Sequence, residues 1–485
     1  MQRLLGRDAI FLYRETPTSL MHTLKVLLLS KADADAGYDY IYERLKERMN
    51  ADPVVRQRIL PVPFGLHHPV MVDDPDFDIS AHVFHAAIPA PGTMRELDKL
   101  VAQIGSTLLD RSRPLWEIWI LEGLENGQVA VVQKIHHAMA DGKAYLGFLT
   151  EGWKEHSETA TALEQAPPLP GNTRLLWNAL LDHLKHDIWN LWPIMKSFIG
   201  NLLELHKRNK ASEEPRVNPL TATFPRTRFN YALGVKRGFA TCQLSLAEIK
   251  ALKEQLGVTL NDVVLAIMAG ALRRYFIAND ELPDAPLATS VPVGADDPGV
   301  VRRMGNNVTT LFTMLHVEIE DPLQRLYAIK KQTEQGKADL AVFGKHQWGD
   351  LMEYVPPGYM TWSCRRNFRL KPANAPDFHP NCNLAISNVP GPREKLGSDD
   401  GALEALYSAG VLGEGMGLNI TVWSYMDQLN VGSLACHKAM PDLERLNQAI
   451  PAALAELQLA AASAQAAGEI HTASSGSGPA PATQL

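Results

Sequence analysis

The chain has 485 residues, and its 47 Lys and Arg against 54 Asp and Glu give a formal net charge of −7. This length suggests two domains or three. A hydrophobic share of 46% with 21% charged residues excludes disorder of the whole chain. The acidic balance argues against a dedicated nucleic-acid-binding protein, which would carry a basic domain or stripe. We therefore expect a globular protein without a nucleic-acid partner.

The cysteines and the N-terminus indicate the expected compartment. The four cysteines never approach C-x-x-C spacing, so neither a zinc site nor a disulfide framework is predicted. The N-terminus lacks the basic start, long apolar core and cleavage site of a secretory signal. No window reaches ~18 consecutive apolar residues, the length of a membrane-spanning helix. A cytoplasmic location is the expectation.

Residues 1–160 are expected to form one domain in which helices and strands alternate. Apolar residues at helical spacing predict helices over 38–49 and 94–109. Runs of β-branched residues at 117–121 and 128–135 flank the turn-forming segment EGLENG and predict a hairpin. This alternation favours an α/β or α+β domain.

Residues 161–225 are expected to be a linker that contains amphipathic helices. Apolar residues recur from Trp177 to Leu202 at alternating steps of four and three, which predicts one helical stripe with a kink at Pro193. Residues 174–210 hold six Lys or Arg and only three Asp or Glu. Two interpretations stay open: a helix pair packed on the domains, or helices that lie in the plane of a membrane surface.

A second globular unit is expected over residues 226–461. Ser245, followed three residues later by Glu248, has the spacing of a capping box, and Gly257 marks the end of that helix. The further elements expected here are helices over 259–275 and 441–461 and strands over 288–293, 309–317, 384–388 and 420–423. The Ala, Ser, Gly and Pro of residues 462–485 predict a disordered tail.

The most informative segment is KIHHAMADGK, residues 134–143. Successive side chains of a strand point to opposite faces, so His136 and His137 cannot do the same job. A histidine at a strand end with a carboxylate nearby can act as a general base near neutral pH. A third ligand at helical spacing is missing, so no metal site is predicted. Two ordinary buried histidines are the alternative. A second pair, His67 and His68, has no Asp-Gly downstream and is expected at the surface.

HHAMADG resembles the HHxxxDG motif of the CoA-dependent acyltransferase superfamily. Further segments resemble the bacterial wax ester synthase/diacylglycerol acyltransferases: LLDRSRPLWEIWILEGL their PLW region, TLNDVVLAIMAGALRRY their ND helix, and ISNVPGP their NVP motif. The opening RDAIFLYRE, followed by LMH, resembles the first strand region of that family. The matches follow the order of the family over roughly residues 5 to 455.

This resemblance implies a fold and a reaction. The fold is α/β (α+β), with two chloramphenicol-acetyltransferase-like domains and an interdomain channel. In the reaction, the hydroxyl of a fatty alcohol or diacylglycerol attacks an acyl-CoA thioester directly, without an acyl-enzyme, and gives wax esters or triacylglycerol. Acyl-CoA is then a substrate, and no bound cofactor is expected.

The resemblance also assigns roles to residues. His137 would be the general base, and His136 would support it from the other side of the strand. Asp141 would orient the loop by pairing with a basic group that the sequence does not identify, and Gly142 would permit the turn. Asn261 is the candidate donor to the oxyanion. Capping of the following helix is an equal interpretation of that residue.

Five further residues are candidates for the substrate site. Pro114, Leu115 and Trp116 are expected to shape the pocket or to pack the domain. Asn419 and Thr421 lie on an interior strand pattern that can reach the cavity, although burial with satisfied hydrogen bonds is the favoured interpretation.

The sequence departs from the family at residues 20–25. Many relatives read Pro-Met-His-Val-Gly-Gly there, whereas this chain reads Leu-Met-His-Thr-Leu-Lys. The lining of the acyl channel, and with it the preferred chain length, stays open.

Three alternative functions also stay open, one of which is an ordinary soluble acyltransferase for small alcohols. A nonribosomal peptide condensation domain shares HHxxxDG and the fold but forms an amide between carrier-bound substrates. A non-catalytic lipid-binding or droplet-surface protein would use residues 174–210. Our central hypothesis is an O-acyltransferase at the cytoplasmic face of a membrane or on lipid droplets.

Overall fold

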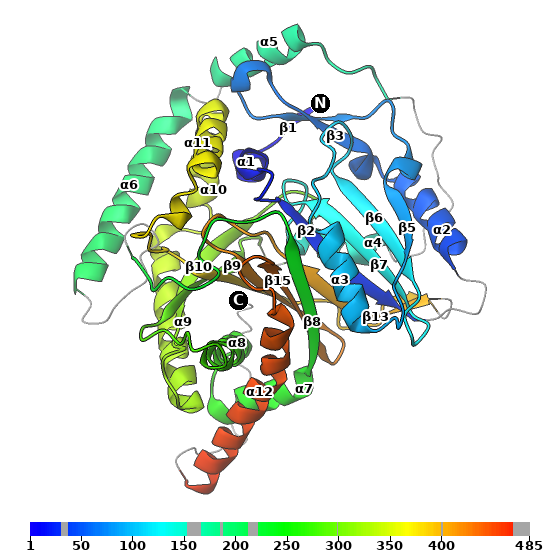
Figure 1. The fold of residues 1–485 in the computed structure, drawn as a ribbon. Coiled ribbons are helices and arrows are strands. Elements are labelled where there is room, and N and C mark those ends of the chain that lie inside the picture. The colour runs from blue at the N-terminus through cyan, green and yellow to red at the C-terminus, as the bar shows by residue number, and fades with distance from the viewer. Residues whose placement is uncertain are drawn as a thin grey trace.

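The computed structural model describes residues 1–30, 37–152, 166–184, 188–211, 222–297, 299–398 and 401–468. The strands in this part of the chain form two six-stranded sheets and one three-stranded sheet. Figure 1 shows the two larger sheets in adjoining lobes, each with helices packed against it. The mixed α/β class predicted from the sequence is confirmed.

The first large sheet has the strand order β12-β13-β2-β7-β6-β5. Its strands are β12 (Gly397–Ser398), β13 (Gly401–Ala409), β2 (His22–Leu29), β7 (Val129–His136), β6 (Trp116–Glu122) and β5 (Val83–Ala87). The antiparallel pairing of β6 with β7 confirms the predicted hairpin. β13 lies in the C-terminal half of the chain, yet it pairs with β2. The first sheet is therefore not built from residues 1–160 alone.

The second large sheet has the strand order β10-β9-β11-β14-β15-β8. Its strands are β10 (Val308–Leu315), β9 (Leu287–Gly294), β11 (Leu384–Val389), β14 (Leu418–Tyr425), β15 (Gln428–Cys436) and β8 (Arg237–Ser245). Its main core is shared with four helices, α7 (Leu246–Leu256), α8 (Leu260–Ile277), α9 (Pro322–Phe343) and α12 (Leu443–Ala466). The start of α7 is as predicted, because the Ser245 hydroxyl accepts the Glu248 N–H and Gly257 ends the helix in the left-handed conformation.

A small sheet and the remaining helices complete the described structure. The sheet has the order β1 (Gln2–Arg3), β4 (Val70–Asp73), β3 (Gln57–Leu60), and the short helices η1 (Pro53–Arg56) and η2 (Pro63–Gly65) flank β3. The other helices are α1 (Gly6–Arg14), α2 (Tyr38–Ala51), α3 (Met94–Ile104), α4 (Gly142–Gly152), α5 (Asn172–Asp182), α6 (Ile188–Ala211), α10 (Gln347–Glu353) and α11 (Pro357–Leu370). α3 covers one face of the first large sheet, whereas α2 and α4 pack with the opposite face.

Two expectations for the N-terminal region are wrong. Residues 7–15 do not form a strand region, because α1 runs from Gly6 to Arg14 and buries residues one helical turn apart. His67 and His68 are buried, not at the surface. His68 Nδ1 and Nε2 lie 2.7 Å from the Tyr13 hydroxyl and 2.9 Å from the Glu353 carbonyl oxygen, so both ring nitrogens are used inside the protein.

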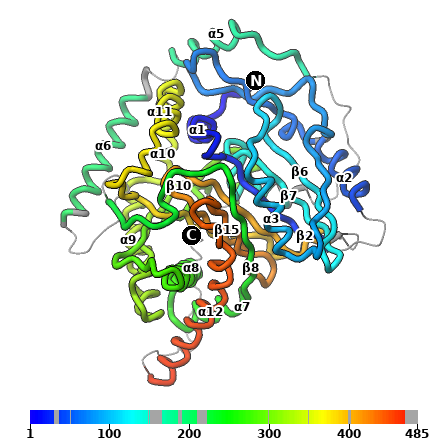
Figure 2. The backbone as a smooth tube through the Cα atoms, viewed as in Figure 1, coloured from blue at the N-terminus to red at the C-terminus, as the bar shows by residue number. Residues whose placement is uncertain are grey.

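The predicted linker and tail are described only in part. Residues 161–165, 185–187 and 212–221 of the linker and 469–485 of the tail lie outside the described residues. Within the described part, the range expected to form one stripe is divided between two helices, α5 and α6, and α6 runs through Pro193. Figure 2 shows α6 beside α10 and α9, along one side of the second lobe.

No single helix in the described ranges has both the length and the apolar character needed to cross a membrane. Only α7 and α8 pass that test as a pair, and they meet at an angle of 107°. The residues of α8 that would face lipid are instead part of the core of the second large sheet.

Candidate active site

The HHAMADG segment follows the central strand β7 of the first large sheet. Gln133, Ile135 and His137 alternate with Lys134 and His136, so the two groups face opposite sides of the sheet. The His137 N–H donates to the Met21 carbonyl oxygen at 2.7 Å, which extends the pairing of β7 with β2 beyond the last strand residue. Strand geometry therefore separates the two histidines, as the sequence predicts.

His137 is held by an amide on the segment between β9 and β10. Its Nδ1 lies 2.9 Å from the Asn306 Oδ1 atom. The Asn306 Nδ2 atom donates to Asp8 Oδ1 and to the His137 carbonyl oxygen, both at 2.8 Å. A carbonyl oxygen can only accept, so this side of the amide must be the NH₂ group and the side toward His137 must be the oxygen. His137 Nδ1 then carries the proton, and Nε2 keeps its lone pair.

The surroundings of His137 keep its ring neutral. The Phe11 ring of α1 stacks on it with a centroid distance of 4.1 Å and an interplanar angle of 11°. Burial, assisted by the charge of Lys25, lowers the pKa of His137 to about 4, although the nearby Asp141 and the bond to Asn306 act in the opposite direction. At neutral pH, His137 is therefore a base with an unprotonated Nε2.

His136 has different partners on the opposite face. Its Nδ1 accepts the Ala138 N–H at 3.1 Å, which leaves the proton on Nε2, 3.2 Å from Glu15 Oε2. Burial opposes ionisation of Glu15, but His136 and Arg111 outweigh it and lower the pKa of that carboxyl to about 2. One nitrogen of this fully buried ring accepts a backbone N–H and the other faces the Glu15 carboxylate, so His136 supports the loop and offers no free base.

The basic partner of Asp141 is Arg302. Arg302 Nη2 lies 2.7 Å from Asp141 Oδ2, and the same guanidinium contacts Asp296. The other oxygen of Asp141 accepts the Ala144 N–H at 2.8 Å, at the start of α4. Asp141 Oδ2 also accepts the Asn307 N–H. This carboxylate therefore joins the HHAMADG loop to residues 302–307, the segment that supplies Asn306.

Gly142 was expected to permit the turn after Asp141, and it is not one of the described glycines with positive φ. It begins α4, and a Cβ atom there would lie 3.3 Å from the Val389 Cγ2 atom. The lack of a side chain lets β11 and β14 approach the start of α4, with Trp423 3.7 Å from the same position. Close packing, and not backbone conformation, explains the glycine.

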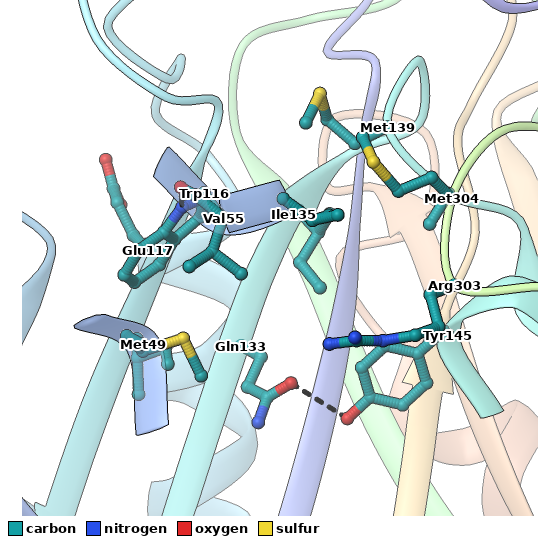
Figure 3. A pocket seen from close by; sticks show the side chains of 13 residues that line it. Met49, Val55, Trp116, Glu117, Gln133, Ile135, Met139, Tyr145, Arg303 and Met304 are labelled. Carbon is teal, nitrogen blue, oxygen red and sulfur yellow. Dashed lines mark hydrogen bonds between the residues drawn. The ribbon is translucent and has the colours of Figure 1, made fainter. Parts of the chain in front are cut away.

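A cavity lies beside the HHAMADG loop (Figure 3). It is lined mainly by apolar and aromatic side chains from η1, β6, β7 and the loop itself, with two residues from the 302–307 segment. The labelled lining residues in Figure 3 are Met49, Val55, Trp116, Glu117, Gln133, Ile135, Met139, Tyr145, Arg303 and Met304. Gln133 and Ile135 share the sheet face of His137. His137 itself is not among the lining residues, and the mainly apolar lining suits an apolar part of a ligand.

A buried lysine lies near this cavity. Lys25 is 5% exposed and is paired in register with Gln133, and its Nζ donates to the Ser408 hydroxyl at 2.6 Å. The ammonium is 5.2 Å from the centroids of both the Tyr145 and the Trp423 rings. Burial lowers the pKa of Lys25 to about 7, although Asp141 raises it. Lys25 is the last residue of segment 20–25, which departs from the family pattern at four positions, 20, 23, 24 and 25.

The three residues of the PLW region have separate places. Trp116 lines the cavity, and its indole N–H donates to the Val55 carbonyl oxygen at 2.7 Å. Leu115 lies in the apolar cluster that also holds Met139 of the loop, and its carbonyl oxygen accepts the His136 N–H. Pro114, which is buried, precedes them. Only Trp116 of the three lines the cavity.

The other predicted residues lie away from this network. Asn261 is the second residue of α8, and no hydrogen bond in the described part of the chain joins it to His137. Its neighbour Asp262 forms a capping box with Thr259. The Asn419 Oδ1 atom accepts the Thr421 hydroxyl at 2.8 Å, and both residues are buried. Their hydrogen bonds fit the interpretation of a satisfied interior.

Asn306, Asp8 and Arg302 are candidate site residues that sequence reasoning missed. Asp8 was hidden by the expectation of a strand over residues 7–15, whereas a helix reading would have placed its acidic side chain on a buried face. Asn306 and Arg302 lie on an irregular segment with no motif. Across the described ranges, no group of three His, Cys, Asp or Glu side chains is placed as metal ligands would be.

Solved structures with a similar fold indicate the class of protein to which this chain belongs. A wax ester synthase/diacylglycerol acyltransferase from Marinobacter aquaeolei VT8 aligns over 95% of this chain and 100% of its own, with a TM-score of 0.67 and 28% identity. The first condensation domain of the CDA synthetase aligns over 95% of this chain and 96% of its own, with a TM-score of 0.56 and 13% identity. The second likeness shows the fold alone. The fold and the HHxxxDG site define an acyltransferase.

The family follows from the sequence matches. Residues 4–264 match the wax ester synthase/diacylglycerol acyltransferase catalytic domain, and residues 304–458 match the WS/DGAT C-terminal domain. A Mycobacterium tuberculosis protein, provisionally named as a diacylglycerol O-acyltransferase, is 35% identical over 475 residues, covering 96% of this chain and 98% of its own. The chain belongs to the wax ester synthase/diacylglycerol acyltransferase family and is an enzyme of that family. The resemblance seen in its motifs is confirmed.

Proposed function

We propose that the enzyme moves a long-chain acyl group from acyl-CoA to the hydroxyl of a fatty alcohol, a diacylglycerol or both, with His137 as the general base. The observation that carries the proposal is the chain of contacts from Asp8 through Asn306 to His137 Nδ1. It leaves Nε2 as the basic nitrogen. Alcohols ionise far above neutral pH, so proton removal during attack is worth roughly 10²–10⁴ in rate.

The proposed step balances as follows. The hydroxyl oxygen bonds to the thioester carbon while its proton moves to His137 Nε2. The carbon–sulfur bond then breaks, and the proton passes from Nε2 to the departing CoA sulfur. The products are an ester and free CoA, so acyl-CoA is a substrate and the step requires no resident cofactor or metal.

The cavity supports a long-chain substrate. Its lining is apolar apart from Glu117, Gln133 and Arg303, and the Gln133 carbonyl group is already bonded to the Tyr145 hydroxyl at 2.9 Å. An apolar chain can fill such a space without leaving many buried polar groups unpaired. Both a fatty alcohol and a diacylglycerol meet this requirement.

Asn261 remains the proposed donor to the oxyanion. If it fills this role, Asn261→Ala lowers kcat by about 10²–10³ while the unfolding midpoint changes little. Because Thr259 and Asp262 form the cap of α8, a purely structural Asn261 would leave both kcat and the midpoint nearly unchanged in this variant. Measuring both on one preparation separates the two roles.

We also infer that residues 174–210 contact a membrane or lipid-droplet surface. Trp177 of α5 is 61% exposed, and Leu181 and Leu184 are exposed beside it. α6 packs through Phe198 against Phe343 of α9, yet Trp192 on it is exposed. Exposed aromatic and leucine side chains on helices with basic flanks are typical of interfacial helices. Charge reversal of Lys207 and Arg208 should reduce sedimentation with liposomes, and unchanged sedimentation would contradict the contact.

The test of the proposed reaction is release of CoA thiol from palmitoyl-CoA in detergent, with hexadecanol or dioleoylglycerol as acceptor. We expect release that depends on the acceptor and disappears in His137→Ala, and the two rates rank the acceptors. Release that persists in the variant would assign the base to another residue. Absence of release with both acceptors would contradict the proposed substrates.

A further inference from the structure

A second exposed surface lies outside residues 174–210 and combines aromatic side chains with arginines. It is formed by η2 and α11, and we call it the η2–α11 surface. Its members are Phe64, Tyr359, Trp362, Arg365, Arg366 and Arg369, all of them exposed. All except Tyr359 line one groove between the two elements.

The tip of η2 holds an aromatic ring out of the protein. Phe64 is 86% exposed, and its φ of 61° lies in the left-handed region, which is costly for a side chain of this size. A Cβ atom on Gly65 would lie 3.2 Å from the Gly358 Cα atom, so the tip lies directly against the first turn of α11. The fold thus holds an apolar side chain in water beside a basic helix.

The arginines lie along one stretch of α11. Arg365 and Arg369 are one turn apart, and the Arg366 guanidinium carbon is 6.0 Å from the centroid of the Trp362 ring. Within the described ranges, no ion pair joins Arg365 or Arg369 to a carboxylate. α11 contains no acidic residue, although the whole chain has a net charge of −7. The attraction of this protein to an anionic surface must therefore come from local sites such as this one.

We propose that the η2–α11 surface binds the headgroups of anionic phospholipids in a bilayer. The guanidinium groups match lipid phosphates, and the rings of Phe64 and Trp362 suit the boundary between headgroups and acyl chains. The proposal deepens the membrane contact proposed for residues 174–210, because it assigns selectivity for negative charge to a different element. α5 adjoins η2, and His183 Nε2 lies 2.7 Å from the Leu66 carbonyl oxygen, so both surfaces belong to one side of the molecule.

The same surface is one helix away from the candidate base. α11 packs on α1, and α1 supplies Phe11 and Asp8 to the His137 network. Figure 1 shows α1 between α11 and the first large sheet. A bilayer bound at α11 would therefore lie on the side of the molecule from which α1 reaches the site.

The experiment is sedimentation of the full chain with vesicles of phosphatidylcholine alone and of phosphatidylcholine mixed with phosphatidylglycerol. The test variant is Arg365→Gln/Arg366→Gln/Arg369→Gln. A basic residue near an anionic surface contributes about a factor of five to partitioning, so the triple variant should bind the mixed vesicles about 100-fold more weakly. Added salt should weaken binding of the unmodified protein in the same direction.

A matched control removes the same charge at the other end of the molecule. Lys250→Gln/Lys253→Gln/Arg445→Gln changes three cations on α7 and α12, which lie far from α11 in Figure 1. We expect this variant to bind mixed vesicles nearly as the unmodified protein does. Phe64→Ser/Trp362→Ser should weaken binding while preserving its salt dependence.

Three results would overturn the proposal. The first is equal binding of the unmodified protein to both kinds of vesicle, or to neither. The second is equal binding of the triple variant and the control variant. The third is displacement by free CoA at constant ionic strength, which would assign the arginines to CoA phosphates. The assay of acyl transfer in detergent contains no vesicles. It therefore tests the proposed reaction separately from the proposed membrane binding.

Discussion

His136 and His137 are adjacent in sequence but have opposite environments. His136 faces the α3 side of the sheet, accepts a backbone N–H at Nδ1 and directs Nε2 toward Glu15. His137 faces the other side and is bonded at Nδ1 to a neutral amide. The two rings are therefore held as opposite tautomers. The difference teaches that the position of a neighbouring acceptor, and not the residue type, decides which histidine can receive a proton.

One helix contributes to both environments. α1 supplies Asp8 and Phe11 to the His137 network, and Glu15, which directly follows α1, lies against His136. The Glu15 carboxylate contacts His136 directly. The Asp8 carboxylate, in contrast, reaches His137 through the side-chain amide of Asn306. The amide orients His137 without placing a negative charge against the ring, and burial keeps the ring neutral.

The largest expected effect comes from truncating each histidine in turn. His137→Ala should lower kcat by roughly 10²–10⁴, because the base is lost, with a smaller change in the unfolding midpoint than at His136, because His137 is only partly buried. His136→Ala should lower the free energy of unfolding by about 2–5 kcal/mol, because it empties a fully buried site. Steady-state kinetics and chemical denaturation of both variants measure the contrast. If both variants lost the same amount of kcat and kept equal stability, the proposed difference between the two histidines would be wrong.

A smaller effect is expected from removing the amide that fixes the tautomer. Asn306→Leu should lower kcat on the order of 10²-fold, since misplacement of a reacting group by about 1 Å has that cost. Asn307→Leu is the comparison variant: it removes a neighbouring amide that bonds Asp296 and not His137, and its backbone N–H still reaches Asp141. We expect the control to keep most of the activity. Equal losses in the two variants would indicate a general packing defect.

The smallest effect is expected from Lys25→Met and is visible in pH dependence. The charge of Lys25 lowers the pKa of His137, so its removal should raise that pKa, by less than about one unit.

The folded-state pKa of Lys25 itself is lowered from 10.5 to about 7, so between these values the unfolded chain binds more protons. Stability should then rise with pH above 7, by up to about 1.4 kcal/mol per pH unit. The variant should lack this slope in denaturation measured at pH 7 and 8.5, and an unchanged slope would contradict the assignment.

The parts of the fold that depend on residues close together in the sequence could be predicted from the sequence. The hairpin of β6 and β7 has turn residues between two β-branched runs, and α7 has its cap and its terminal glycine. β13 was missed because its partner β2 lies far away in sequence, and no local pattern reports such a pairing. The separation of His136 from His137 required only the alternation of a strand.

The partners in the site could not be predicted for the same reason. Arg302 meets Asp141 across 161 residues, and Asn306 meets Asp8 across 298. Their segment is irregular, so periodicity assigns its side chains no direction. Gly142 shows a different limit, since its place in the HHxxxDG motif suggested a turn, whereas the structure shows the close approach of Val389 to this position. Such contacts are properties of the folded chain.

The most direct test of the account is the tautomer of each histidine, measured by ¹⁵N NMR of the protein labelled at histidine, with His136→Gln and His137→Gln used for assignment. The account predicts a neutral His137 with its proton on Nδ1 and a neutral His136 with its proton on Nε2, both unchanged between pH 6 and 8. A His137 ring that is charged in this range, or that carries its proton on Nε2, would contradict the claim that Nε2 is the base.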